Sequence, residues 1–126
     1  MLLDTHALLW WLSDDEALTK PARKAIGDIR NAVWISAASA WEIAIKVRLG
    51  RLATAAALAA DFPGHLHREG FQMLPISCDH AIRAGLLPGA HKDPFDRMLV
   101  AQAQAENLPI ISDEALFDTY GVRRIW

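Results

Sequence analysis

Acidic side chains stand directly after short apolar runs near both ends of the chain. Asp4 follows Met1-Leu2-Leu3, and the pair Asp113 and Glu114 follows Pro109-Ile110-Ile111-Ser112. If both runs are parallel strands of one sheet, these acids stand at its carboxyl edge, where open α/β sheets bind their ligands. We therefore expect Asp4, Asp113 and Glu114 to share one crevice.

Two further acids lie in expected helices. Glu42 belongs to a helix that begins after a short β-branched and aromatic run, and Ser39, Glu42 and Lys46 align along one side of that helix. Asp96 stands in the first turn of a helix that Asp93-Pro94 opens. Both carboxylates reach the same crevice if their helices pack over the carboxyl edge of the sheet.

Four carboxylates in one partly buried pocket would repel one another and lose hydration, which raises their pKa values unless cations compensate. Oxygen ligands suit Mg²⁺ and Mn²⁺, whereas a pocket poor in histidine and cysteine disfavours zinc. Two such ions about 4 Å apart would stabilise both the attacking and the leaving oxygen of a phosphodiester displacement. The pattern therefore predicts metal-dependent hydrolysis of RNA.

Each of these acids also has a structural alternative. A carboxylate beside a helix start can cap free backbone N–H groups, and a glutamate followed four residues later by a lysine can form a weak surface ion pair. The first alternative is open to Asp4, Asp93, Asp96, Asp113 and Glu114, and the second to Glu42 with Lys46. Their joint placement at one edge favours the functional interpretation.

Apolar spacing predicts the elements that position these acids. The expected strands cover residues 1–3, 32–35, 71–76, 109–111 and 122–125, and the expected helices cover 5–12, 18–29, 37–49, 53–62, 79–86 and 94–106. Short, wholly apolar strands that alternate with helices indicate a parallel sheet covered on both faces. We expect one domain over residues 1–126, a three-layer α/β/α sandwich around a central, mostly parallel sheet.

Composition limits the classes of partner. The 126 residues are 52% hydrophobic and carry a formal net charge of -2, so a packed core is expected and an overall cationic field is excluded. Any contact with nucleic acid must be local, and the candidate phosphate contacts are Lys46, Arg48, Arg51, Lys92 and Arg97.

The single cysteine, Cys78, cannot form an intrachain disulfide and fits a reducing compartment. The sequence shows neither a basic secretory start nor an apolar run near the roughly 20 residues of a membrane helix. We therefore expect a cytoplasmic protein without membrane contact.

The histidines and tryptophans are expected to be packing residues rather than zinc ligands or contacts to bases. His65 and His67 fall in an expected loop without a third ligand, so no zinc site is predicted, and His6 is expected to pack beside the site. Trp10, Trp11 and Trp41 are expected to be anchors of the core or of a dimer interface rather than platforms for bases.

Four segments together resemble the PIN-domain family, and within it the VapC-type toxins of prokaryotic toxin-antitoxin pairs. They are Leu2-Leu3-Asp4-Thr5-His6, Ile35-Ser36-Ala37-Ala38-Ser39-Ala40-Trp41-Glu42-Ile43, His91-Lys92-Asp93-Pro94-Phe95-Asp96-Arg97-Met98-Leu99, and Ile111-Ser112-Asp113-Glu114 with Tyr120-Gly121-Val122. The resemblance implies a PIN-like fold, endoribonuclease activity that depends on Mg²⁺ or Mn²⁺, and a homodimer. It also implies inhibition by a VapB-like antitoxin that threads into the active-site groove.

The resemblance assigns the catalytic acids, which are also the metal ligands, to Asp4, Glu42 and Asp96, with Asp93 as a neighbouring acid. The family's fourth acid is an aspartate two residues after Ser or Thr, and counting from Ser112 this position is Glu114. A glutamate there departs from the family, since its longer side chain would shift a bound metal. Glu114 is the preferred fourth acid, and Asp113 is the alternative.

Three other classes of protein are alternatives to this interpretation. A phosphoacceptor receiver domain needs an adjacent acidic pair after its first strand and a late lysine, but Asp4 is followed by Thr5-His6 and no lysine follows Lys92. A haloacid-dehalogenase-like phosphatase needs a second aspartate where His6 stands. A catalytically inactive PIN-like protein that only binds its antitoxin stays open because of Glu114.

Overall fold

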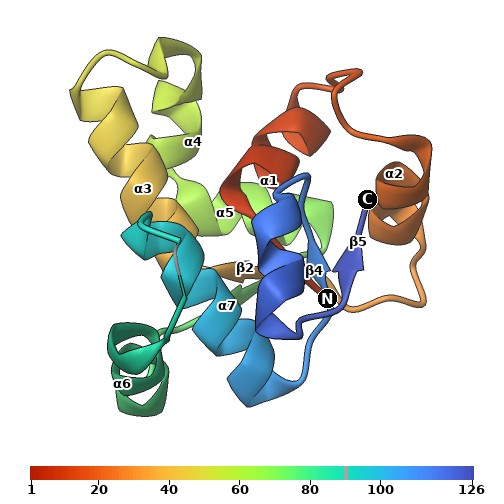
Figure 1. Ribbon diagram of the computed structural model, residues 1–126. Coiled ribbons are helices and arrows are strands. Elements are labelled where there is room, and N and C mark those ends of the chain that lie inside the picture. The colour runs from red at the N-terminus through yellow and green to blue at the C-terminus, as the bar shows by residue number, and fades with distance from the viewer. Residues whose placement is uncertain (90) are drawn as a thin grey trace.

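The computed structural model describes residues 1–89 and 91–126 (Figure 1). Within these residues, short strands form one five-stranded parallel sheet in the order β3-β2-β1-β4-β5. The strands are β1 (Leu2–Leu3), β2 (Trp34–Ser36), β3 (Gln72–Leu74), β4 (Ile110–Ile111) and β5 (Arg124–Ile125). The predicted parallel sheet is thus confirmed.

The strand order indicates where along the sheet a ligand would bind. The chain leaves β1 toward β2 and β3 on one side and returns to β4 and β5 on the other, so the order reverses between β1 and β4. In doubly wound sheets a ligand binds beyond the carboxyl ends of the strands at such a reversal. Receiver-type sheets follow the order 2-1-3-4-5 instead, which speaks against the receiver alternative.

Helices connect the strands and cover both faces of the sheet (Figure 1). They are α1 (Thr5–Leu12), α2 (Lys20–Gly27), α3 (Ala37–Arg48), α4 (Ala56–Ala60), α5 (Phe62–Glu69), α6 (Cys78–Leu86) and α7 (Pro94–Glu106), with the 3₁₀ turns η1 (Ala53–Ala55) and η2 (Ala115–Tyr120). Most of these bounds agree with the predicted ones to within two or three residues.

The side chains of each strand alternate between the two faces of the sheet, and the core is divided accordingly into two clusters. Leu3, Ile35 and Ile111 belong to one buried cluster, which they share with residues of α1, α2, α3 and α5. Leu2 and Ile110, one position earlier, belong to a second cluster with residues of α7 and η2. Because successive side chains of a strand point to opposite faces, these clusters lie on opposite sides of the sheet, and the three-layer prediction is confirmed.

The largest error of the sequence interpretation concerns residues 53–69. One helix over 53–62 and a loop were expected, but η1 and α4 end at Ala60 and α5 continues to Glu69, so His65 and His67 are helical. Pro-Gly pairs such as Pro63-Gly64 often mark turns. Instead Asp61 caps α5 by accepting a hydrogen bond from the Gly64 N–H at 3.2 Å, with the proline in the first turn, where its missing N–H costs nothing.

Two large apolar residues lie outside the core. Ile29 is 99% exposed because α2 ends at Gly27, and Trp41 is 62% exposed on α3. Of the two alternatives predicted for Trp41, the core is thus excluded and the dimer interface stays a prediction, whereas Trp10 and Trp11 pack against the first buried cluster. In the part of the chain that the structure describes, no helix combines the length and apolar character needed to cross a membrane.

Candidate active site

Asp4 occupies the point where β1 passes into α1. Its backbone N–H bonds to the Ile111 carbonyl at 3.1 Å, which joins it to the end of β4, and its carboxylate caps α1 by accepting from the Ala7 N–H at 2.7 Å. Asp4 therefore does cap the helix, but the cap uses only one of its two carboxylate oxygens. Asp4 is 4% exposed, and the remaining oxygen has little access to bulk water.

The segment after β4 supplies the next acids. The Ser112 hydroxyl is buried and accepts from the Glu114 N–H at 2.9 Å, which bends the chain sharply at the strand end. Glu114 then caps η2, since its Oε1 accepts from the Leu116 N–H at 3.0 Å. Glu114 is half-buried and Asp113 is exposed.

Asp96 lies in the first turn of α7. Asp93 caps this helix by accepting from the N–H groups of Phe95 and Asp96 at 2.9 and 3.4 Å, as predicted. A reciprocal cap would need the Asp93 N–H, but this N–H donates to Nδ1 of His91 at 3.3 Å, so the Asp96 side chain turns elsewhere. Its Oδ2 lies 3.0 Å from the Nε2 atom of His91, so the reciprocal cap considered for Asp96 does not form.

Glu42 faces inward from α3. It is 5% exposed, and its Oε2 accepts from the Lys46 ammonium at 2.8 Å. The expected pairing with Lys46 is therefore present, but the carboxylate is buried rather than solvated. Beside it in the same helix, the buried Ser39 accepts a hydrogen bond from the Thr5 hydroxyl at 3.0 Å, which joins α3 to α1 next to Asp4.

Four of the predicted acids meet at one cavity of about 250 Å³. Its walls are formed by Asp4, His6, Trp10, Asp96, Asp113 and Glu114. The structure thus brings together four predicted acids from three separate segments. Glu42 does not line this cavity, although its charge acts on Asp96, and Asp93 is engaged in capping α7.

Burial, together with the crowding of like charges, raises the pKa values of acids in the site. Burial, followed by the charges of Asp93, Asp4, Glu42 and Glu114, raises the pKa of Asp96 from 3.8 to about 7. Burial also raises the pKa of Asp4, against hydrogen bonds from Ser112 and Ala7 that lower it. Without a cation, the cavity therefore disfavours full ionisation of its carboxylates near neutral pH.

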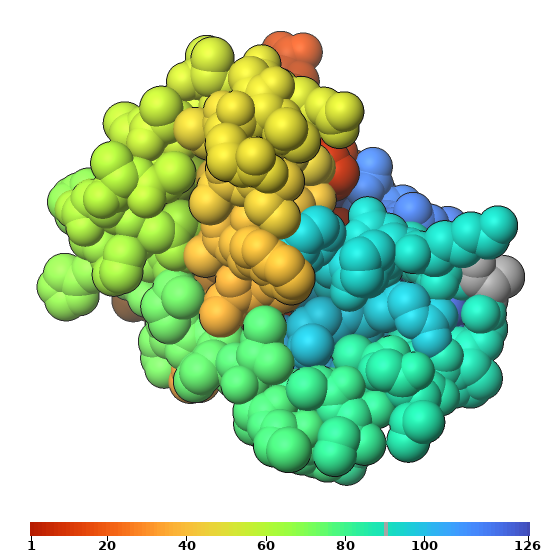
Figure 2. All heavy atoms as spheres, turned by 90° about the vertical axis from the view of Figure 1, so that its left-hand side faces the viewer, coloured from red at the N-terminus to blue at the C-terminus, as the bar shows by residue number. Residues whose placement is uncertain are grey.

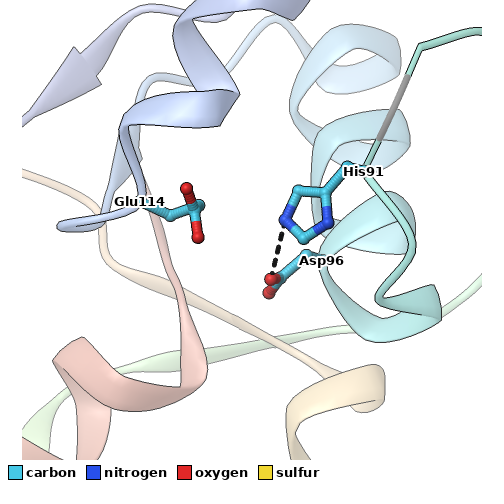
Figure 3. A group of neighbouring side chains, drawn as sticks. All are labelled: His91, Asp96 and Glu114. Carbon is cyan, nitrogen blue, oxygen red and sulfur yellow. Dashed lines mark ion pairs between the residues drawn. The ribbon is translucent and has the colours of Figure 1, made fainter.

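His91 lies beside the acidic cavity, and the sequence interpretation gave it no role there. Figure 3 shows its ring turned toward Asp96, with Glu114 across the same space. One ligand-type atom from each of these three residues lies within 4.8 Å of the other two. A signal in the sequence was its position in the quoted segment that contains Asp93 and Asp96.

Two predicted phosphate contacts have partners within the protein. Lys46 is bound to Glu42, and the Arg97 guanidinium donates to the His91 carbonyl at 2.9 Å. Lys92, Arg48 and Arg51 are exposed, and their role toward phosphates stays a prediction.

Comparisons with known proteins show which family and fold the chain matches. A sequence model of the PIN domain family matches residues 1–122. Ribonuclease VapC16 of Mycobacterium tuberculosis is 46% identical over 59 residues, which cover 47% of this chain and 40% of that relative. The match thus spans less than half of either protein.

Solved structures with the same fold include three toxin-antitoxin or related complexes. VapBC2 from Rickettsia felis bound to a promoter DNA fragment matches with a TM-score of 0.71 at 15% identity, over 99% of this chain and 98% of that one. FitAB bound to the IR36 DNA fragment matches with 0.69 at 16% identity, over 98% and 92%. A toxin-antitoxin complex from Klebsiella pneumoniae matches with 0.58 at 20% identity, over 92% and 88%. At these identities the likeness shows the fold alone.

Proposed function

Since the chain belongs to the PIN domain family, we propose that it is a metal-dependent endoribonuclease, a hydrolase that cleaves phosphodiester bonds in RNA. One observation carries the proposal: Asp4, Asp96 and Glu114, which are far apart in the sequence, line a single cavity at the carboxyl edge of the sheet. A purely structural use of each acid would not require them to converge. The name of the VapC16 relative, a ribonuclease, supports RNA as the substrate.

The donor set of the cavity fits a divalent cation. Asp4, Asp96 and Glu114 present carboxylate oxygens, which Mg²⁺ and Mn²⁺ prefer, and we propose these ions as the cofactors. Glu42 lies close enough to act on Asp96 electrostatically, with Lys46 balancing its charge. When bound, such an ion would neutralise the clustered charge and activate water for attack on the phosphodiester.

We propose that the four acids have different roles in the site. Asp4 is fixed by the Ala7 N–H and by its position between β1 and α1, so one of its oxygens is held rigidly toward the cavity. Glu114 is the proposed fourth acid because it is half-buried beside Asp96, whereas Asp113 is exposed at the rim. Glu42 is proposed as the remaining ligand or as a residue that orients one.

We further propose that the protein is the toxin of a toxin-antitoxin pair and that a VapB-like antitoxin inhibits it. A second cavity of about 560 Å³ runs between α1, η1, α4 and α5, and it shares His6 and Trp10 with the acidic cavity. A bound peptide segment could therefore fill the apolar groove and reach the acids. The complexes formed by the structural relatives support this proposal, and we expect both partners to meet in the cytoplasm.

A homodimer is proposed for the face formed by α3, α6 and the start of α7, which come together in Figure 2. A cavity of about 340 Å³ between them is lined mainly by apolar side chains. Trp41, which lines this cavity, is 62% exposed, and Ile82 and Leu86 elsewhere on α6 are 57% and 79% exposed. Large exposed apolar side chains of this kind are typical of protein interfaces.

The proposed activity is tested by incubating the purified protein with total RNA in EDTA and then titrating Mg²⁺ or Mn²⁺. We expect cleavage only with metal, and its loss in Asp4→Asn and Asp96→Asn. Asp79→Asn is a matched control, because this aspartate is exposed and pairs with Arg83 on α6. Cleavage that persists in EDTA or survives both substitutions would contradict the proposal, and a protein that binds metal but cleaves no RNA would favour the inactive alternative.

A further inference from the structure

The His91 ring is held in place from several directions. The backbone N–H of His91 donates to the Tyr120 hydroxyl at 3.2 Å, and its carbonyl accepts from Arg97. The ring stacks on Phe117, with centroids 5.8 Å apart and an angle of 29° between the planes. Contacts with both η2 and α7 therefore set the orientation of the ring before any ligand binds.

A backbone hydrogen bond determines which ring nitrogen carries the proton. The Asp93 N–H donates to Nδ1 of His91 at 3.3 Å, and a nitrogen that accepts a hydrogen bond has no hydrogen of its own. In a neutral imidazole the hydrogen must then be on the other nitrogen. Nε2 of His91 is therefore a donor.

This donor points into the acidic cluster without a completed hydrogen bond. Nε2 lies 3.0 Å from Oδ2 of Asp96, as the dashed line in Figure 3 marks, and the His91 side chain is only 10% exposed. Among residues 1–89 and 91–126, however, no acceptor meets this buried N–H with hydrogen-bond geometry. A buried donor without an acceptor costs free energy, so a small turn of the Asp96 carboxylate that completes the bond would be favourable.

The same tautomer argues against direct coordination by His91. A histidine that binds a metal uses the lone pair of one nitrogen, and its other nitrogen donates a hydrogen bond to an acceptor. Here the polarity is reversed, since the nitrogen away from the site accepts a bond from Asp93 and the nitrogen facing the site carries the hydrogen. Closeness to Asp96 and Glu114 therefore does not make the ring a ligand.

We propose that His91 is a positioning residue whose Nε2–H orients the Asp96 carboxylate for cation binding and that its ring is not a cation ligand. The inference rests on the proposed metal-dependent function and deepens it. Without this N–H, Asp96 is free to rotate away from the cavity that it shares with Asp4 and Glu114. Loss of a group that orients a metal ligand typically weakens metal affinity by about ten- to a hundred-fold.

The tautomer is tested in the unaltered protein by NMR of ¹⁵N-histidine-labelled samples. Long-range correlations within each ring identify the protonated nitrogen, and the spectrum of His91→Gln, which lacks one set of signals, assigns His91. We expect hydrogen on Nε2 both without and with saturating Mg²⁺. A hydrogen that is on Nδ1, or that moves there when Mg²⁺ is added, would overturn the inference.

The positioning role is tested by titration calorimetry with Mg²⁺ and with Ni²⁺. His91→Phe keeps an aromatic ring on Phe117 but loses the donor, and we expect both affinities to fall by the same factor of about ten to a hundred. His91→Gln, whose amide can donate from a similar position, should lose less. His67→Phe makes the same change at an exposed position of α5 and should bind as the wild type does.

The outcomes separate this inference from the proposed function. Wild-type protein that binds no Mg²⁺ would overturn the proposed function and this inference with it. If the wild type binds Mg²⁺ and a folded His91→Phe binds it equally well, only the positioning role is wrong. A far larger loss for Ni²⁺ than for Mg²⁺ would identify the ring as a ligand, because imidazole suits Ni²⁺ whereas Mg²⁺ prefers oxygen.

Discussion

Replacing Asp96 with asparagine should stabilise the metal-free protein at mildly alkaline pH. The pKa of Asp96 rises from 3.8 to about 7, chiefly through burial and then through the charge of Asp93 and the other acids. The folded state therefore holds this proton more tightly than the unfolded state does, and stability falls as the pH rises from about 4 through 7. Asparagine keeps the size of the side chain and cannot ionise.

The magnitude follows from the two pKa values. One pKa unit corresponds to about 1.36 kcal/mol, so full ionisation of Asp96 costs the folded state about 4 kcal/mol, of which roughly half develops between pH 5.5 and pH 8. The carboxylate is 25% exposed, and solvent screening makes this an upper value. We expect Asp96→Asn to be more stable than the wild type by about 2 to 4 kcal/mol at pH 8, and by roughly half as much at pH 5.5.

Urea unfolding in EDTA, followed by tryptophan fluorescence at both pH values, measures this difference. Asp79→Asn is the control, because an exposed pair with Arg83 contributes only tenths of a kcal/mol and its loss should hardly depend on pH. The reasoning is refuted if Asp96→Asn is less stable than the wild type at pH 8. It is also refuted if the difference between the two proteins is the same at both pH values.

Three further predictions concern the cation, the fourth acid and the dimer. Mg²⁺ at about a hundred times its Kd should stabilise the wild type by about 2.7 kcal/mol and Asp96→Asn by less, as scanning calorimetry with and without EDTA can measure; equal shifts would disagree with a role of Asp96 in binding. Initial rates of RNA cleavage should fall more in Glu114→Gln than in Asp113→Asn, because Glu114 lies beside Asp96 and Asp113 is exposed; the reverse order would make Asp113 the fourth acid. Sedimentation velocity should show a homodimer that Trp41→Glu dissociates and that Ile29→Glu, altered at an exposed site on another part of the chain, does not; a dimer that survives Trp41→Glu would place the interface elsewhere.

The convergence of the acids could be anticipated because it depends on strand ends. Leu3 and Ile111 are paired in the register of two neighbouring parallel strands, so Asp4 and the segment starting at Ser112 must emerge side by side. The short apolar runs were enough to indicate this. Their order in the sheet was not predicted, because it depends on which helices pack on which face.

The missed features depend on tertiary contacts that local patterns do not encode. Nothing in the sequence shows that Phe117 and Tyr120 of η2 hold His91 against Asp96, across more than twenty residues of chain. The exposure of Trp41 likewise depends on how α3 packs. At α5 the error was local, since Pro63-Gly64 is compatible with a helix start as well as a helix end.

Diffraction from crystals soaked in Mn²⁺ tests the central claim most directly, because anomalous scattering locates the ion independently of activity. The account predicts an anomalous peak in the cavity lined by Asp4, Asp96 and Glu114, and its loss or marked weakening in Asp96→Asn. A peak bound by other residues, or none in this cavity at saturating Mn²⁺, would contradict it.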